Sequence, residues 1–79
     1  MVEISYKGYL IEADPHQLAE SGEWTIFVSI YRHRGSRTTE KPFYDEKRFK
    51  TKEEAIQYCF YFARQIIDGK VKNCTVDDL

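Results

Sequence analysis

Several features that assign a protein to a special class are scarce in this sequence. Its 79 residues include two cysteines, two prolines and four glycines. Two cysteines are too few for a disulfide scaffold, so we expect Cys59 and Cys74 to be reduced thiols; a bridge would require residues 70–79 to fold back onto a helix. The low proline and glycine content, with no low-complexity stretch, argues against disorder.

Long apolar segments are absent as well. No run of about 18 apolar residues occurs, which predicts no membrane span. Residues 1–12 lack the apolar stretch of a secretory signal. These absences favour a cytoplasmic protein without a membrane partner. The length permits one domain and excludes the large α/β enzyme folds.

The net charge is only −1, so bulk electrostatics gives no reason for binding a charged partner. The charges are nevertheless distributed unevenly. Residues 32–50 hold seven lysines and arginines against three acidic residues, whereas the rest of the chain holds five against ten. A basic middle segment therefore lies between acidic ends.

The first part of the chain shows the alternation of apolar and polar residues that predicts β-strands. Strands are expected near residues 2–6 and 9–14, joined by a tight turn at Lys7-Gly8, because glycine takes positive φ without steric cost. One bent strand with a bulge at Gly8 is the alternative. Asp14 before Pro15 is compatible with one helical turn at residues 15–19.

The clearest strand follows at residues 24–32, which are dense in β-branched and aromatic residues. One face of this strand is uniformly apolar and is expected to face the core: Trp24, Ile26, Val28 and Ile30. The other face is mixed: Thr25, Phe27, Ser29 and Tyr31.

After a turn at residues 33–37, a returning strand is expected at 38–44. Pro42 cannot donate a ladder hydrogen bond, so this strand is at a sheet edge or broken. Residues 45–48 are expected to form a polar connector.

A capping box at Thr51 and Glu54 marks the start of a helix. Apolar residues then recur at helical spacing to about Asp68, and Gly69 is suited to end the helix in the left-handed conformation. We therefore predict a single α+β domain over residues 1–69. In it, an antiparallel meander of three or four strands packs on one C-terminal helix in two layers (β-β-β-β-α). Residues 70–79 form a C-terminal tail.

Residue types that carry out catalysis or bind metals are not grouped in the sequence. The two histidines, His16 and His33, have no cysteine or carboxylate pair at ligand spacing. No nucleophile motif occurs, and the glycines lie too far apart to cradle a phosphate. Cys59 lies on the apolar helix face, where a thiolate is disfavoured. We therefore predict no enzymatic activity, no cofactor and no metal site.

The turn at residues 33–37 is unusually basic. Arg32, Arg34, Arg37 and Lys41 crowd it, and arginine binds phosphate oxygens bidentately. These four residues are a candidate contact for nucleic acid or an acidic protein partner. The alternative is a solvated loop that keeps the domain soluble.

Residues 22–67 resemble a known DNA-binding domain. Gly22-Glu-Trp24, the two strands around Gly35 and the segment Phe49-Lys-Thr-Lys-Glu-Glu-Ala55 look like the arm-type domain of phage integrases, which is similar to the plant AP2 domain. The resemblance implies a three-stranded sheet whose face away from the helix enters the DNA major groove and carries cationic side chains. In this chain, Arg37 and Lys41 are the cationic candidates for that face.

Nearly the whole chain resembles a group of small uncharacterised bacterial proteins. The shared pattern comprises Tyr6-x-Gly-Tyr9, Leu18-Ala-Glu-Ser-Gly-x-Trp24, Thr51-x-Glu-Glu-Ala55, Arg64-Gln-Ile-Ile-Asp-Gly69 and an end similar to Val-Asp-Asp-Leu79. This resemblance implies a stand-alone domain with no assigned activity.

Aromatic residues make up 15% of the chain, more than one helix on one sheet can bury. Phe27 and Tyr31 share the outer sheet face, and Tyr44 is a candidate third ring on it. Tyr58 and Tyr61 lie on the outer helix face, where they can instead shield the helix edge. The tail, a second copy of the protein or a ligand can cover the outer sheet face, or its rings stay exposed. We therefore predict a non-catalytic binding or assembly module that forms a homodimer through this face. Nucleic-acid binding through residues 32–41 is the alternative function.

Overall fold

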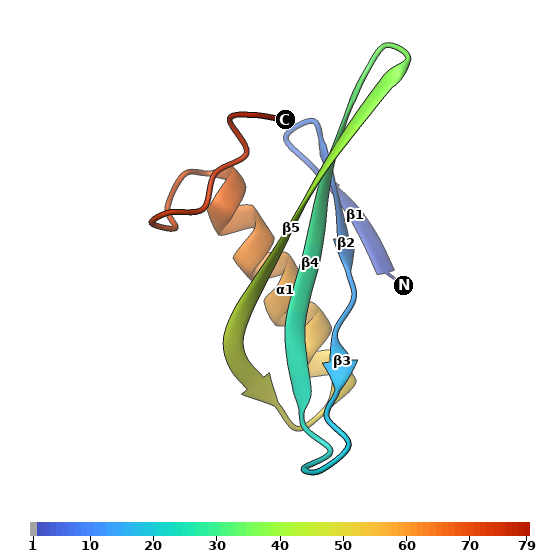
Figure 1. The fold of residues 1–79 in the computed structure, drawn as a ribbon, viewed down its shortest axis with the longest axis vertical. Coiled ribbons are helices and arrows are strands. Elements are labelled where there is room, and N and C mark those ends of the chain that lie inside the picture. The colour runs from blue at the N-terminus through green and yellow to red at the C-terminus, as the bar shows by residue number, and fades with distance from the viewer. Residues whose placement is uncertain (1) are drawn as a thin grey trace.

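The computed structural model describes residues 2–79, which form five β-strands and one α-helix. In chain order these are β1 (Val2–Tyr6), β2 (Tyr9–Ala13), β3 (His16–Gln17), β4 (Trp24–Arg34), β5 (Arg37–Phe49) and α1 (Lys52–Ile67). The strands form one antiparallel sheet, and α1 lies across one side of it, so the fold has two layers (Figure 1). The predicted α+β fold with one C-terminal helix is confirmed.

Strand β4 organises the sheet because three other strands pair with it. Strand β5 pairs along one edge of β4, β2 and β3 pair with successive parts of its other edge, and β1 pairs with β2. The short β3 replaces the helical turn expected at residues 15–19, since His16 and Gln17 pair with Thr25 and Trp24. The sheet therefore has one strand more than the upper limit of the prediction.

Two tight turns set the register of the sheet. Lys7 and Gly8 both have positive φ, 49° and 85°, which is the combination that a type I′ hairpin requires. The predicted hairpin at this position is present, and the alternative of one bent strand is wrong. At the second hairpin, Arg34 pairs with Arg37 across a two-residue turn, and Gly35 in that turn has φ 62°.

Strand β5 is longer than predicted and includes the residues expected to form a polar connector. Ile26 pairs with Asp45, whereas the preceding Thr25 pairs with Arg48. Residues 46–47 are therefore the extra residues of a bulge. Charged side chains can continue a strand here because β5 is an edge strand, with no second partner strand within residues 2–79. The edge position indicated by Pro42 is confirmed.

Helix α1 begins and ends where the sequence indicates. Thr51 Oγ1 accepts a hydrogen bond from the Glu54 backbone N–H at 3.2 Å and donates one to the Glu54 carboxylate at 3.0 Å. At the other end, Gly69 has φ 74° and donates its N–H to Ile66 O at 3.0 Å. A left-handed residue that bonds back to the last turn is a common helix end.

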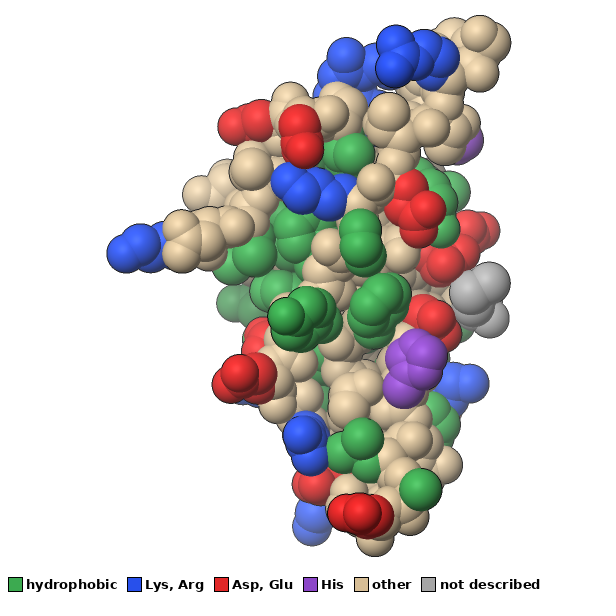
Figure 2. Space-filling view, viewed as in Figure 1, with side chains coloured by type: hydrophobic (Ala, Val, Ile, Leu, Met, Phe, Trp, Pro, Cys, Tyr) green, Lys and Arg blue, Asp and Glu red, His purple; other side chains and the backbone are tan. Residues whose placement is uncertain are grey.

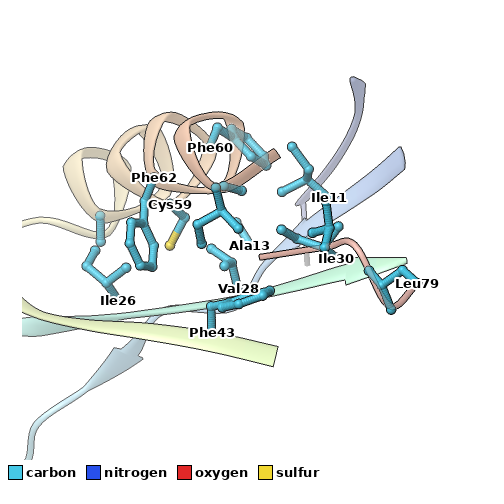
Figure 3. Close-up of a cluster of buried hydrophobic side chains, with 14 residues drawn as sticks. Ile11, Ala13, Ile26, Val28, Ile30, Phe43, Cys59, Phe60, Phe62 and Leu79 are labelled. Atoms are coloured by element: carbon cyan, nitrogen blue, oxygen red, sulfur yellow. The ribbon is translucent and has the colours of Figure 1, made fainter. Parts of the chain in front are cut away.

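The hydrophobic core lies between the sheet and α1 (Figure 3). The sheet contributes Ile11, Ala13, Ile26, Val28, Ile30 and Phe43, and the helix contributes Ala55, Cys59, Phe60, Phe62, Ala63 and Ile66. Two residues of the tail, Val76 and Leu79, belong to the same core and are 5% and 6% exposed. The tail therefore packs on the helix side of the sheet.

Candidate interaction surfaces

The side of the sheet away from α1 carries the aromatic residues predicted from the alternation of β4. Directly paired residues of neighbouring strands share a face. Phe27 therefore lies beside Tyr44, and Tyr31 lies beside Glu40. We call this side the outer face. Its residues on β2 to β5 include Leu10, Glu12, His16, Thr25, Phe27, Ser29, Tyr31, His33, Thr38, Glu40, Pro42, Tyr44 and Arg48.

An exposed apolar patch occupies the middle of the outer face. Tyr44 is 76% exposed, the highest fraction for a large apolar side chain within residues 2–79. Phe27 is half-buried, and its ring meets the His16 ring edge-on, with the ring centroids 5.9 Å apart. Figure 2 shows the hydrophobic side chains gathered over β4 and β5. The patch is therefore centred on Tyr44 rather than on Phe27.

Tyr44 stands between two open hollows. One has a volume of about 770 Å³, lies on the outer face and is lined by residues that include His16, Phe27 and Arg48. The other has a volume of about 470 Å³, lies along β5 and reaches Cys74 in the tail. A projecting ring flanked by hollows is a shape that a second protein surface can complement.

Tyr31 lies next to carboxylates from both neighbouring strands. Its hydroxyl donates a hydrogen bond to Glu12 Oε1 at 3.3 Å, and Glu40 is its pairing partner on β5. Burial, followed by the hydrogen bond and charge of Glu40 and the charge of Glu12, raises the pKa of Tyr31 to about 12. Tyr31 is therefore a neutral hydrogen-bond donor at physiological pH.

The tail does not cover the outer face. Besides the burial of Val76 and Leu79, Lys41 on the helix side of β5 binds the tail through Thr75 O and Asp78 Oδ1, both at 3.0 Å. The bond to Lys41 also lowers the pKa of Asp78. Of the alternatives for Phe27 and Tyr31, cover by the tail is therefore wrong, and a second copy, a ligand or no cover is left.

The basic residues of the β4–β5 hairpin lie on the opposite side from the outer face. Lys41 pairs with the buried Ile30, and Arg34 pairs with Arg37. Arg32 and Arg34 continue the core-facing alternation of β4 beyond Ile30. The structure thus brings the four cations together on the helix side of the hairpin. The expectation that Arg37 and Lys41 lie on the face away from the helix is wrong.

Two of these arginines have partners within the chain. Arg32 Nη1 donates to Tyr9 Oη at 2.9 Å, and its guanidinium carbon lies 5.1 Å from the Tyr9 ring centroid. Arg34 donates to the carbonyl oxygen of Leu79. Arg37 has no ion-pair partner within residues 2–79. The hairpin tip projects beyond the helix, and lysine and arginine side chains gather there (Figures 1 and 2).

Tyr58 and Tyr61 lie on α1, apart from the outer face. The Tyr58 hydroxyl donates to Asp45 Oδ2 at 2.8 Å, and its ring centroid lies 5.3 Å from that of Phe49. Burial, followed by the bond to Asp45, raises the pKa of Tyr58 to about 12. Tyr58 thus joins the helix to the bulge of β5, whereas Tyr61 is 52% exposed. The two predicted aromatic pairs do not form one surface.

Potential metal ligands do not form a cluster in the part of the chain that the structure describes. Within residues 2–79, no three His, Cys, Asp or Glu side chains are placed to hold a metal ion. Cys59 is fully buried and donates to Phe27 O at 3.5 Å, and burial raises the pKa of its thiol. Both cysteines are unpaired.

Sequence reasoning did not find three features of the outer face: the high exposure of Tyr44, which was a candidate third ring, and the charged residues Glu40 and Arg48. The signal that locates Tyr44 and Glu40 is the two-residue turn. Counting backward and forward from Gly35-Ser36 brings residue 31 opposite 40 and residue 27 opposite 44. No such count locates Arg48, because the bulge changes the register.

The arrangement defines a class of protein, a small α+β domain with one antiparallel sheet and one C-terminal helix. The family model of a domain of unknown function, DUF6566, matches residues 2–78. The chain therefore belongs to the DUF6566 family, which confirms the predicted membership in a small single-domain family of unknown function. Neither the comparison with curated proteins nor that with solved structures gave a match. No helix within residues 2–79 is long and apolar enough to cross a membrane.

Proposed function

We propose that this protein is a non-catalytic binding module that self-associates through the outer face. The observation that carries the proposal is the exposure of Tyr44, which projects 76% exposed from the edge strand β5 of a sheet whose other side is occupied by α1 and the tail. Tyrosine is enriched at the centres of protein interfaces because its ring buries a large area at low entropic cost.

A second copy of the chain is the partner that this face fits best. The outer face presents the exposed Tyr44 ring beside Phe27 on one surface, and a surface that packs on the same surface of a second copy forms a two-fold dimer. The resemblance to small bacterial proteins and the two unpaired cysteines support a bacterial cytoplasmic setting.

Sedimentation equilibrium over a concentration series tests this function. Replacement of Tyr44→Ser is expected to raise the dissociation constant of the dimer about tenfold or more, as for a central interface tyrosine. Tyr61→Ser is the matched control, because Tyr61 is also exposed but lies on the helix. A wild-type protein that stays monomeric at high micromolar concentration contradicts the proposal, as does an equal effect of the two substitutions.

Nucleic-acid binding is the second candidate, and the free Arg37 at the projecting hairpin tip supports it. Only the helix side of the tip offers cations, so any contact uses the hairpin rather than the sheet face. Titration with duplex DNA, single-stranded DNA and RNA at about 50 mM salt tests this, with Arg37→Ser as the variant and Lys72→Ser in the tail as the control. Absence of binding at about 100 µM contradicts it, since non-specific binders reach roughly 10⁻⁴–10⁻⁶ M even at higher salt.

A further inference from the structure

We propose that two copies pack outer face to outer face about a two-fold axis that runs across the strands, so that Glu40 of each copy meets Arg48 of its partner. This inference rests on the proposed self-association and specifies its geometry and its pairing charges. The partner is a second copy of this chain.

The free edge of β5 is unsuited to pairing with another strand, which favours the face over the edge. A two-residue turn closes on a hydrogen-bonded pair, here Arg34 and Arg37, and such pairs alternate with pairs that are not hydrogen-bonded. Pro42 is therefore at a position whose backbone groups point away from β4. It removes a donor from the middle of the free edge, and the nearby bulge distorts the same edge.

Two exposed charged residues of β5, Glu40 and Arg48, lie at matching positions on the outer face. Glu40 is level with Tyr31 and Arg48 is level with Thr25, so the two lie three residues on either side of Val28, or about 10 Å at about 3.3 Å per residue. Both are exposed, and neither has an ion-pair partner within residues 2–79. A two-fold axis that crosses the strands at Val28 turns the Tyr31 end of one copy onto the Thr25 end of the other. It keeps β5 of one copy opposite β5 of the other. Glu40 therefore lies opposite the partner's Arg48.

The same rotation matches the apolar patch. Tyr44 and Pro42 lie one residue on either side of the Val28 level, so the Tyr44 ring of each copy meets the partner's Pro42. Glu12 approaches the partner's Asp14, which is a like-charge contact. Each of these carboxylates already has a partner in its own copy: Glu12 accepts from Tyr31, and Asp14 lies 3.4 Å from His16 Nε2.

A two-fold axis along the strands matches the charges less well. It places Glu40 opposite the partner's Leu10 and Arg48 opposite the partner's His16, so both free charges lose their complement. The broad side of the molecule measures 42 by 26 Å, enough for the roughly 800 Å² that each partner buries in a standard interface. Two sheets packed in this way lie about 10 Å apart, a gap that long Glu and Arg side chains can bridge.

Charge-swap variants test the geometry. Glu40→Arg places two arginines together at each end of the interface, and Arg48→Glu places two glutamates together. We expect each variant alone to raise the dissociation constant of the dimer about tenfold or more at low salt, because like charges face each other. In an equimolar mixture, the introduced arginine of one variant meets the introduced glutamate of the other, and the second end keeps its native pair. The mixture is therefore expected to associate about as tightly as the wild type.

Asp77→Arg, which makes the same charge change as Glu40→Arg in the tail, is the control and is expected to leave association unchanged. Circular dichroism confirms that each variant is folded. If the single variants weaken the dimer and the mixture does not recover, or if both variants associate like the wild type, this geometry is overturned while self-association stands. If the wild-type protein is monomeric, the proposed function itself fails.

Discussion

At the scale of single residues, Asp68 makes a connection that no local pattern indicates. It follows the last turn of α1, and its carboxylate accepts hydrogen bonds from Tyr6 Oη at 2.8 Å and from Lys7 Nζ at 2.6 Å. The hydrogen bonds from Lys7 and Tyr6 lower the pKa of Asp68. The hydrogen bond to Asp68 and the charge of its carboxylate raise the pKa of Lys7. The β1–β2 hairpin is therefore held to the C-terminal end of the helix by one carboxylate.

The lowered pKa of Asp68 gives a pH-dependent contribution to stability. The native state favours the ionised carboxylate, so this contribution is present above the ordinary carboxyl pKa of about 4 and is lost as pH falls through the lower native value. Asp68→Asn is expected to lower the unfolding midpoint in urea at pH 7, with a difference from the wild type that shrinks below about pH 4. Asp77→Asn in the tail serves as the control. A difference for Asp68→Asn that stays constant from pH 7 to pH 3 would rule out this linkage.

At the scale of elements, β5 is an edge strand of 13 residues, a length that exposes many backbone groups to pairing with other chains. Its charged side chains, its bulge and Pro42 are devices that protect such edges. Pro42 costs the sheet nothing, because its nitrogen faces away from β4. The residue that interrupts the strand pattern in the sequence is therefore compatible with a continuous strand in the fold.

Replacing Pro42 tests whether its missing N–H group protects the free edge of β5 from association. Pro42→Val adds an N–H group to the centre of the free edge and a side chain that favours strands. We expect increased light scattering at high protein concentration, caused by edge-to-edge association. Thr38→Val adds the same side chain to the same edge without a new donor and is the matched control. Equal scattering by the two variants would show that the missing donor is not the protective feature.

At the scale of the whole molecule, the sequence predicted those parts that follow a period or a local motif. Alternation located the core side of β4, and the capping box and Gly69 located α1. The bulge of β5 was missed because Asp45 to Arg48 are polar, and polarity alone does not distinguish an edge strand from a connector. Strand β3 was missed because two residues cannot show a period, and its pairing depends on β4.

The candidate surfaces were predictable to a similar extent. Phe27 and Tyr31 were correctly assigned to the face away from the helix, since alternation decides the side. The same alternation assigns Arg32 to the helix side, and it extends to Arg34 only because β4 continues through residues that were expected to form a turn. The place of the tail could not be predicted, because its few apolar residues have no regular spacing and their burial depends on contacts with Lys41 and the core.

The order of the contacts along the chain also determines when the fold can be completed during synthesis. The β1–β2 hairpin needs only neighbouring residues and can form early, whereas its anchor at Asp68 is added 62 positions after Tyr6. Val76 and Leu79 are added later still, although they fill the core beneath a sheet that is already translated. A nascent chain therefore carries a paired but partly uncovered sheet until these residues arrive, and this interval is when the protected edge of β5 matters most.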